Sequence, residues 1–229
     1  MLRSRTVFAS YEHFLDIAAS VQWDERSIAL REDARAWPRV ADDRLIELVA
    51  GFCVGEAGVA EHLAVFADGP AAACFAAQRR DEQRHARFFA RYAAAVGLHD
   101  PAAHVSQAFG ELFEVRLPEA VAGAPGEAVG LYHMVLEGVV FTAGQLLLLD
   151  LLDHAPLPGL RHGVELVLRD ERWHVGFGAR CLADLDYDEA AILAEGERAA
   201  ALWAPEYAGR VTDGLRSRLR AVRRQAALA

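Results

Sequence analysis

The sequence predicts an all-α protein, in which four long helices form a bundle and further helices pack on it. Hydrophobic residues make up 53% of the chain, and Ala and Leu dominate while runs of β-branched residues are short, a composition that favours helices packed on helices. At 229 residues the chain is long enough to bury the core of one domain and is marginal for two. We therefore expect a single domain over residues 1–229.

Turn signals rich in Gly and Pro divide the chain into long pieces with helical periodicity. In the first piece Leu45, Val49 and Phe52 begin an apolar stripe at the spacing of one helix face. The later pieces are similar in length and apolar content. The expected bundle core covers about 41–185, with helices at about 41–67, 70–96, 127–153 and 158–185.

The remaining segments are expected to pack on this bundle. The N-terminal segment, 1–40, contains several aromatic residues that would lie across it. A short helix at about 102–116 would cross between the two halves, and a turn is expected from Pro118 to Gly126. Residues 187–225 are expected to form one long C-terminal helix.

Charge and cysteine usage exclude several classes of protein. A formal net charge of −9 argues against nucleic-acid binding, which depends on clustered Lys and Arg. The arginine-rich tail, 216–224, is interpreted as a solvated helix end. Cys53, Cys74 and Cys181 form no CxxC pair, which indicates a reducing compartment and excludes a cysteine zinc site.

No segment of signal-peptide type is expected at the N-terminus, so the predicted location is the cytoplasm. The most apolar segment, Met134 to Leu152, contains Glu137, Gln145 and Asp150. We interpret it as a helix buried in protein and predict no membrane span. Apolar surface contributed by Leu146 to Leu152 suggests a homodimer as one hypothesis.

A repeated motif carries the chemistry. Asp81 to His85 and Asp170 to His174 both read D-E-x-x-H, and each lies in a predicted bundle helix. Residues three apart share one face of a helix, so the Glu and His of each motif can bind a common point inside the bundle. One such pair is weak evidence of a metal site, whereas two in matching positions are much stronger.

The geometry of helix hairpins then predicts an inward-facing Glu on the helix before each motif. Glu56 and Glu137 both lie within strongly apolar sequence that has no nearby Lys or Arg. A buried carboxylate costs several kcal/mol unless it is paired or bound to metal. Helical bundles build di-metal sites in this pattern. The six predicted metal ligands are Glu56, Glu82, His85, Glu137, Glu171 and His174.

Charge balance supports two divalent ions, because four carboxylates neutralise two such ions in an apolar core. Mixed carboxylate and imidazole ligands with open coordination positions suit iron or manganese better than a closed structural zinc site. We therefore predict an Fe/Fe or Mn/Fe centre.

Residues next to the six are assigned supporting roles. Asp170 is predicted to hold the second ring nitrogen of His85, and Asp81 that of His174; the alternative is two surface aspartates. His133, one turn before Glu137, is either an extra ligand or a histidine beside the site. Glu61 is expected to face solvent.

At these residues the chain resembles the ribonucleotide reductase small-subunit superfamily of ferritin-like di-metal carboxylate proteins. It is most similar to the branch of ligand-binding oxidases, which are thought to bind a fatty acid beside a manganese–iron or di-iron centre. The resemblance covers about 20–185, including Trp23 to Trp37, Tyr132 to Gly138 and Arg169 to Gly176. It implies a ferritin-like four-helix bundle core with additional helices.

Three further positions bear on the branch. The oxidases join a valine and a tyrosine through an ether cross-link, and the corresponding residues are Val59 and Tyr132, which are also ordinary core residues. Phe89 stands where the reductase subunit usually carries its radical tyrosine. These residues would contribute to a cross-link or a substrate pocket, and radical transfer to a reductase partner is not expected.

The predicted function is activation of dioxygen at two metal ions, in order to oxidise or oxygenate a small, mostly apolar organic substrate with electrons from a separate donor. The resemblance implies that this substrate is fatty-acid-like. The first alternative is a ferroxidase or iron-handling protein without an organic substrate. The second is a metal-free helical binding or scaffold protein.

Overall fold

The computed structural model describes residues 8–63 and 69–227, and within these residues every regular element is helical. The elements in chain order are α1 (Tyr11–Ser20), η1 (Glu25–Ser27), α2 (Arg31–Val40), α3 (Asp43–His62), α4 (Ala72–Val96), η3 (Pro101–His104), α5 (Gln107–Glu111), η4 (Leu112–Arg116), α6 (Leu117–Ala122), α7 (Pro125–Val129), η5 (Gly130–Phe141), α8 (Thr142–Leu152), α9 (Pro158–Leu182), α10 (Glu189–Trp203), η6 (Pro205–Tyr207) and α11 (Ala208–Ala226). The predicted all-α fold is confirmed.

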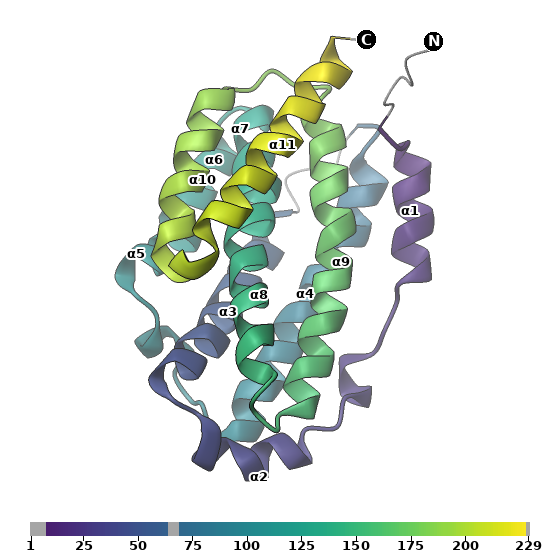
Figure 1. Ribbon diagram of the computed structural model, residues 1–229. Coiled ribbons are helices and arrows are strands. Elements are labelled where there is room, and N and C mark those ends of the chain that lie inside the picture. Colours follow the sequence, from purple (N-terminus) through teal and green to yellow (C-terminus); the bar gives the residue numbers. More distant parts are fainter. Residues whose placement is uncertain (1–7, 64–68, 228–229) are drawn as a thin grey trace, which may run out of the picture.

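Four long helices form the bundle: α3, α4, the continuous helix α7–η5–α8, and α9 (Figure 1). They correspond to the four predicted pieces, although the last part of the first piece, 64–67, lies outside the described residues. The helix α1 packs on α4 and α9, and α2 packs on the same two helices near one end of the bundle. The helices α10 and α11 cover η5.

Local sequence explains where the bundle helices begin. The Asp42 carboxylate accepts a hydrogen bond from the Leu45 amide at 2.8 Å and so caps the first turn of α3. The helix α9 begins at Pro158, and the buried carboxylate of Asp33 on α2 accepts from the amides of Gly159 and Leu160 at 2.9 and 2.7 Å. The N-terminal segment therefore holds the start of a helix that carries two of the six predicted metal ligands.

The predicted single C-terminal helix is wrong. The chain breaks at Ala204, which is not helical (φ −133°, ψ 69°), and two helices follow one another as a hairpin, α10 and α11 (Figure 1). Pro205 is the cause, because proline disfavours helical backbone at the residue before it. The break folds α11 back onto η5 and α9.

The connection between the two halves also differs from the prediction. Instead of one helix at about 102–116, the chain forms a series of short helical pieces that continues to Ala122. The turn was predicted to start at Pro118 but starts at Gly123. Proline is tolerated in the first turn of a helix, and Pro118 lies in the first turn of α6.

One helix, Pro125–Leu152, is long and apolar enough to cross a membrane by length and composition, but 67% of its most apolar window is buried inside the chain. It is the helix of the bundle that carries Glu137, which agrees with its interpretation as a core helix. The leucines from 146 to 152 are all buried or half-buried within the chain. The homodimer stays a prediction.

Close packing of α4 against α9 depends on Gly163. A Cβ atom added at Gly163 would overlap the ring of Phe88, which packs next to the metal-ligand turn of α4, whereas one added at Gly110 would meet no atom within 4 Å. We expect Gly163→Ala to lower the free energy of unfolding by about 1–3 kcal/mol, and Gly110→Ala to leave it unchanged or slightly raised. Urea unfolding of the two variants checks this, and equal stabilities would contradict it.

Candidate metal centre

The structure brings all six predicted ligands together in the middle of the bundle. Each of the four long helices contributes: Glu56 comes from α3, Glu82 and His85 from α4, Glu137 from η5, and Glu171 and His174 from α9. Five of these side chains belong to residues with 0% exposure, and Glu171 is 2% exposed. A cluster of four carboxyl groups is therefore sealed almost completely from solvent.

The six residues form two overlapping groups that could each hold one metal ion. Glu56, Glu82, His85 and Glu171 form the first, and Glu82, Glu137, Glu171 and His174 form the second; within each group one ligand atom per residue lies within 4.8 Å of the others. Glu82 and Glu171 belong to both groups. The arrangement fits two ions joined by two bridging carboxylates, each completed by one further Glu and one His.

Both histidines turn the same ring nitrogen toward the carboxylates. His85 Nδ1 lies 3.5, 3.4 and 3.4 Å from oxygens of Glu56, Glu82 and Glu171. His174 Nδ1 lies 3.0 and 3.4 Å from oxygens of Glu82 and Glu171. The Nδ1 atoms are therefore the ones placed to bind metal.

The opposite ring nitrogens face the two aspartates of the motifs. Asp170 Oδ2 lies 3.2 Å from His85 Nε2, and Asp81 Oδ2 lies 3.5 Å from His174 Nε2. Both aspartates are fully buried rather than on the surface. Such contacts fix the orientation of a ligating imidazole, and this role for Asp81 and Asp170 stays a prediction.

Arg84 joins the two aspartates. Its NH2 group lies 2.7 Å from Asp81 and 2.8 Å from Asp170, and the side chain is only 5% exposed. Trp23 Nε1 also donates to Asp170 at 2.6 Å, and its ring stacks on that of His85. Sequence analysis missed both contributions, although Arg84 lies three residues after Asp81, at a spacing that places two side chains on one helix face.

The fit of metal ions to these residues rests on unsatisfied polar atoms. Buried polar groups in proteins are almost always hydrogen-bonded. Among the six residues, several buried carboxylate and imidazole atoms have no hydrogen-bond partner in the described part of the chain: Glu56 Oε1 and Oε2, Glu82 Oε2, His85 Nδ1, Glu137 Oε2 and Glu171 Oε1. Unpaired atoms of the same kinds outside the six are His133 Nδ1 and Glu195 Oε1. The concentration of such atoms in one cluster fits hard divalent cations, which would satisfy them.

Burial and mutual contact displace the pKa values of the cluster. Burial raises the pKa of the Glu56 carboxyl to about 8, and burial together with the Glu171 charge raises that of Glu137 well above its usual value. Burial opposes ionisation of His85 and His174, yet contacts with the surrounding carboxylates raise both pKa values well above 6.5. Perturbed groups of this kind are typical of functional sites.

Gln78 is a second residue that sequence analysis missed. Its amide nitrogen donates to Glu137 Oε1 at 2.5 Å and lies 3.3 Å from Glu82 Oε1, while its oxygen lies 3.0 Å from His133 Nε2. Its position four residues before Glu82, on the same helix face, was a usable signal. His133 belongs to neither ligand group, and its Nε2 contacts Gln78, which in turn contacts Glu137. Its role beside the site stays a prediction.

The helix that carries Glu137 has an unusual backbone. From Gly130 to Phe141 it is π-helical, and the Thr142 hydroxyl donates to the Glu137 carbonyl at 2.8 Å. Wide turns of this kind are frequent at functional sites. Nothing in the spacing of apolar residues predicts it.

The three remaining predicted residues lie in the core. Tyr132 OH lies 3.4 Å from the Val59 carbonyl oxygen, and both residues have 0% exposure. Phe89 stacks on Phe52 with ring centroids 4.9 Å apart. Glu61 is exposed, as expected.

Comparison with solved structures places this architecture among known proteins. Variants of an R2-like ligand-binding oxidase with an aerobically reconstituted Mn/Fe cofactor have the same fold. One matches with a TM-score of 0.72 at 17% sequence identity, covering 94% of this chain and 92% of that chain. Another matches with a TM-score of 0.69 at 21% identity, covering 94% and 85%.

The likeness establishes a shared ferritin-like fold, since the identities are low. No protein-family model matches the chain, and no curated protein matches it.

Proposed function

We propose that this chain is a non-haem di-metal oxidoreductase that holds two ions, Fe/Fe or Mn/Fe, and uses dioxygen to oxidise a small organic substrate. The observation that carries the proposal is the cluster of six buried ligand groups, of which two are common to both ion positions. When bound, such a pair of ions supplies a site where dioxygen is activated. The solved oxidases with the same fold carry a Mn/Fe cofactor, which supports this choice of metals.

The residues of the chain have distinct tasks in this proposal. Glu82 and Glu171 would contribute to both ion positions, while the pairs Glu56 with His85 and Glu137 with His174 would complete the separate positions. Asp81 and Asp170 keep Nδ1 of each histidine directed at its ion through contacts with Nε2. Burial of the whole cluster excludes bulk water from the reaction.

An organic substrate is supported by a pocket that reaches the centre. Glu171, the one ligand residue with measurable exposure, lines a cavity of about 410 Å³ beside α9. This volume lies within the roughly 300–1,000 Å³ of small-molecule sites. The other five ligand residues do not line it. A substrate would therefore approach the ions along α9, and electrons would come from a separate donor.

A cross-link between Val59 and Tyr132 is part of the proposal. It would remove one hydrogen from the valine side chain and the hydroxyl hydrogen from the tyrosine, form a C–O bond, and pass two electrons to dioxygen. The two residues are in contact next to the carboxylates. Phe89, four residues after His85, leaves no tyrosine at that position to be oxidised instead.

The test is aerobic loading of the metal-free protein with Fe(II), or with Mn(II) and Fe(II) together, followed by metal analysis and oxygen consumption. We expect two ions per chain, one for each ligand group, and oxygen uptake that stops when the centre is oxidised unless substrate and reductant are present. Peptide mass spectrometry of the same sample detects the cross-link, with Tyr132→Phe as the control. Continued oxygen uptake with excess Fe(II) would identify a ferroxidase instead, and a protein that binds no metal would contradict both.

A further inference from the structure

The helix that carries Glu137 keeps a wide winding for an unusual length. In a π-helix each carbonyl oxygen accepts a hydrogen bond from the amide five residues later, and such turns normally occur singly. Here the π-helical segment η5 covers 12 residues, Gly130 to Phe141, and Glu137 lies within it. Contacts from elsewhere in the chain are therefore expected to stabilise the wider winding against the ordinary α-helix.

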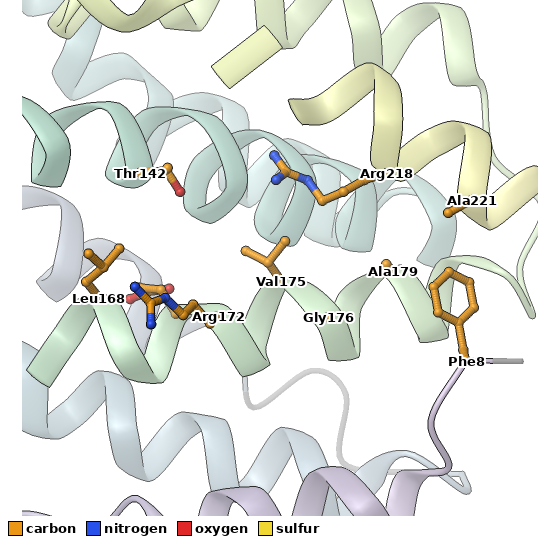
Figure 2. Close-up of a pocket in the computed structure, with 10 residues that line it drawn as sticks. Phe8, Thr142, Leu168, Arg172, Val175, Gly176, Ala179, Arg218 and Ala221 are labelled. Carbon is orange, nitrogen blue, oxygen red and sulfur yellow. The ribbon is translucent and has the colours of Figure 1, made fainter. Parts of the chain in front are cut away.

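Side chains hold the two carbonyl oxygens at the metal-ligand position of this helix. The Thr142 amide donates to the Glu137 carbonyl, which is a π-helical hydrogen bond, and the Thr142 hydroxyl donates to the same oxygen at 2.8 Å. The next carbonyl, that of Gly138, accepts from Arg218 Nη2 at 2.6 Å. Figure 2 shows Arg218 reaching from α11 toward the helix that carries Thr142. A contact from another helix is therefore made directly beside Glu137.

The absence of a side chain at Gly138 allows this contact. A Cβ atom at residue 138 would lie 2.9 Å from Arg218 Nη2 and 3.0 Å from the His133 carbonyl oxygen. His133 lies five residues earlier, which is the spacing of a π-helical hydrogen bond. Glycine is unfavourable in the interior of a helix, so its presence fits a position where the guanidinium and the widely wound backbone both approach closely.

No competing contact draws the guanidinium away from Gly138. Arg216, on the same helix, forms ion pairs with Glu197 and Asp213. In contrast, Arg218 forms no ion pair with the described residues, and its buried Nε has no hydrogen-bond partner among them. Within 8–63 and 69–227 the Gly138 carbonyl is the one hydrogen-bond acceptor of this guanidinium. A charged donor makes a stronger hydrogen bond than a neutral one, so this contact can stabilise a backbone conformation.

We propose that Arg218 is a positioning residue for the Glu137 carboxylate. Its hydrogen bond to Gly138 stabilises the π-helical winding of η5, and that winding directs Glu137 at the second ligand group, which includes His174. An α-helix has fewer residues per turn, so a change to α-helical winding would rotate Glu137 about the helix axis relative to the residues before it. Arg218 thereby acts on one ion position and leaves the other, to which Glu137 does not belong. The inference rests on the proposed function for the ion position, whereas the winding itself does not.

Hydrogen exchange of the metal-free chain tests the winding. Removal of the charged donor in Arg218→Ala should speed exchange of the amides from 138 to 143 about tenfold or more, since hydrogen bonds to charged groups contribute on that scale. Arg220→Ala is the matched control, because Arg220 is an exposed arginine on the same helix. Val222→Ala removes buried packing from α11 and leaves the donor in place. It should speed exchange in α11 and η5 alike, without a selective effect on 138–143.

Metal binding tests the effect on Glu137. Arg218→Ala should weaken binding of the second ion about tenfold or more and leave the first ion bound, whereas Val222→Ala should retain both. Arg218→Lys should restore part of the lost affinity, because its ammonium group can donate to the same carbonyl.

A second variant removes the contact without removing the arginine. Gly138→Ala displaces the guanidinium, because the new Cβ atom would lie 2.9 Å from Arg218 Nη2. The same two effects are expected, namely fast exchange at 138–143 and weaker binding of the second ion. This variant takes the place of Arg218→Ala if that protein does not fold.

The outcomes separate this role from a purely structural one. Equal exchange rates at 138–143 in Arg218→Ala and Arg220→Ala would overturn the inference. So would a lowered melting temperature in Arg218→Ala with both ions bound as tightly as in the wild type, or equal effects of Arg218→Ala and Val222→Ala, because Arg218 would then only dock α11. If the wild type binds no metal ions, the proposed function fails, and selectively faster exchange at 138–143 in Arg218→Ala would still support control of the winding.

Discussion

Substitution of either shared carboxylate, Glu82→Ala or Glu171→Ala, is expected to abolish binding of both metal ions. Each of these residues belongs to both ligand groups, so its loss removes a ligand from both ions and leaves a centre with excess positive charge. Glu56→Ala or Glu137→Ala removes a ligand from one group only. These two variants are expected to keep one ion and lose the other.

Metal content after aerobic loading and gel filtration checks this expectation. The wild type should retain two ions per chain, the shared-ligand variants almost none, and the single-group variants one. Glu61→Ala is the matched control, because Glu61 is an exposed glutamate on α3, five residues after Glu56. Retention of two ions in Glu82→Ala, or the same loss in all four variants, would show that the ligands are not shared in this way.

The stability of the metal-free protein is expected to fall as the pH rises from about 5 to 8. The pKa of Glu56 is about 8 in the folded chain against an ordinary value of 4.5, and that of Glu137 is also raised, in both cases chiefly by burial. Between these values the folded state binds more protons than the unfolded state, so a rise in pH favours unfolding. The raised pKa values of His85 and His174 act in the same direction, because the stability they contribute is lost as pH rises through the folded value.

The expected loss is on the order of a few kcal/mol, and urea unfolding of chelator-treated protein at several pH values measures it. Glu56→Gln should make the decline shallower, because the amide needs no proton to remain neutral. The metal-loaded protein should become more stable over the same range, since ions compete with protons for these ligands. If the metal-free protein instead becomes more stable toward pH 8, the pKa values of the buried carboxyl groups are not raised in the folded state, and the prediction is wrong.

The bundle and the six clustered residues could be predicted from sequence because both depend on periodicity. Glu82 and His85 share one helix face through their spacing, as do Glu171 and His174. Glu56 and Glu137 were recognisable because a carboxylate within apolar sequence needs a partner. These signals are local, and they can be recognised in the sequence without knowledge of how the helices pack.

Other features depend on tertiary structure and gave little or no local signal. The contact of Trp23 with Asp170 joins residues 147 positions apart, and the π-helical backbone of η5 follows from no apolar spacing. The break at Pro205 is different, because a local signal was present and was overlooked. That break returns α11 to the bundle, where it packs on η5 and α9.

The contacts of Gln78 make the two halves of the repeated motif chemically unequal. Gln78 donates a hydrogen bond to Glu137, whereas neither oxygen of Glu56 has a hydrogen-bond partner in the described part of the chain. A ligand held by an amide has less freedom to change its coordination than one held by nothing else. The two ligand groups therefore have similar residue types but unlike surroundings. If each held one ion, exchanging the identities of the two ions would not give an equivalent protein.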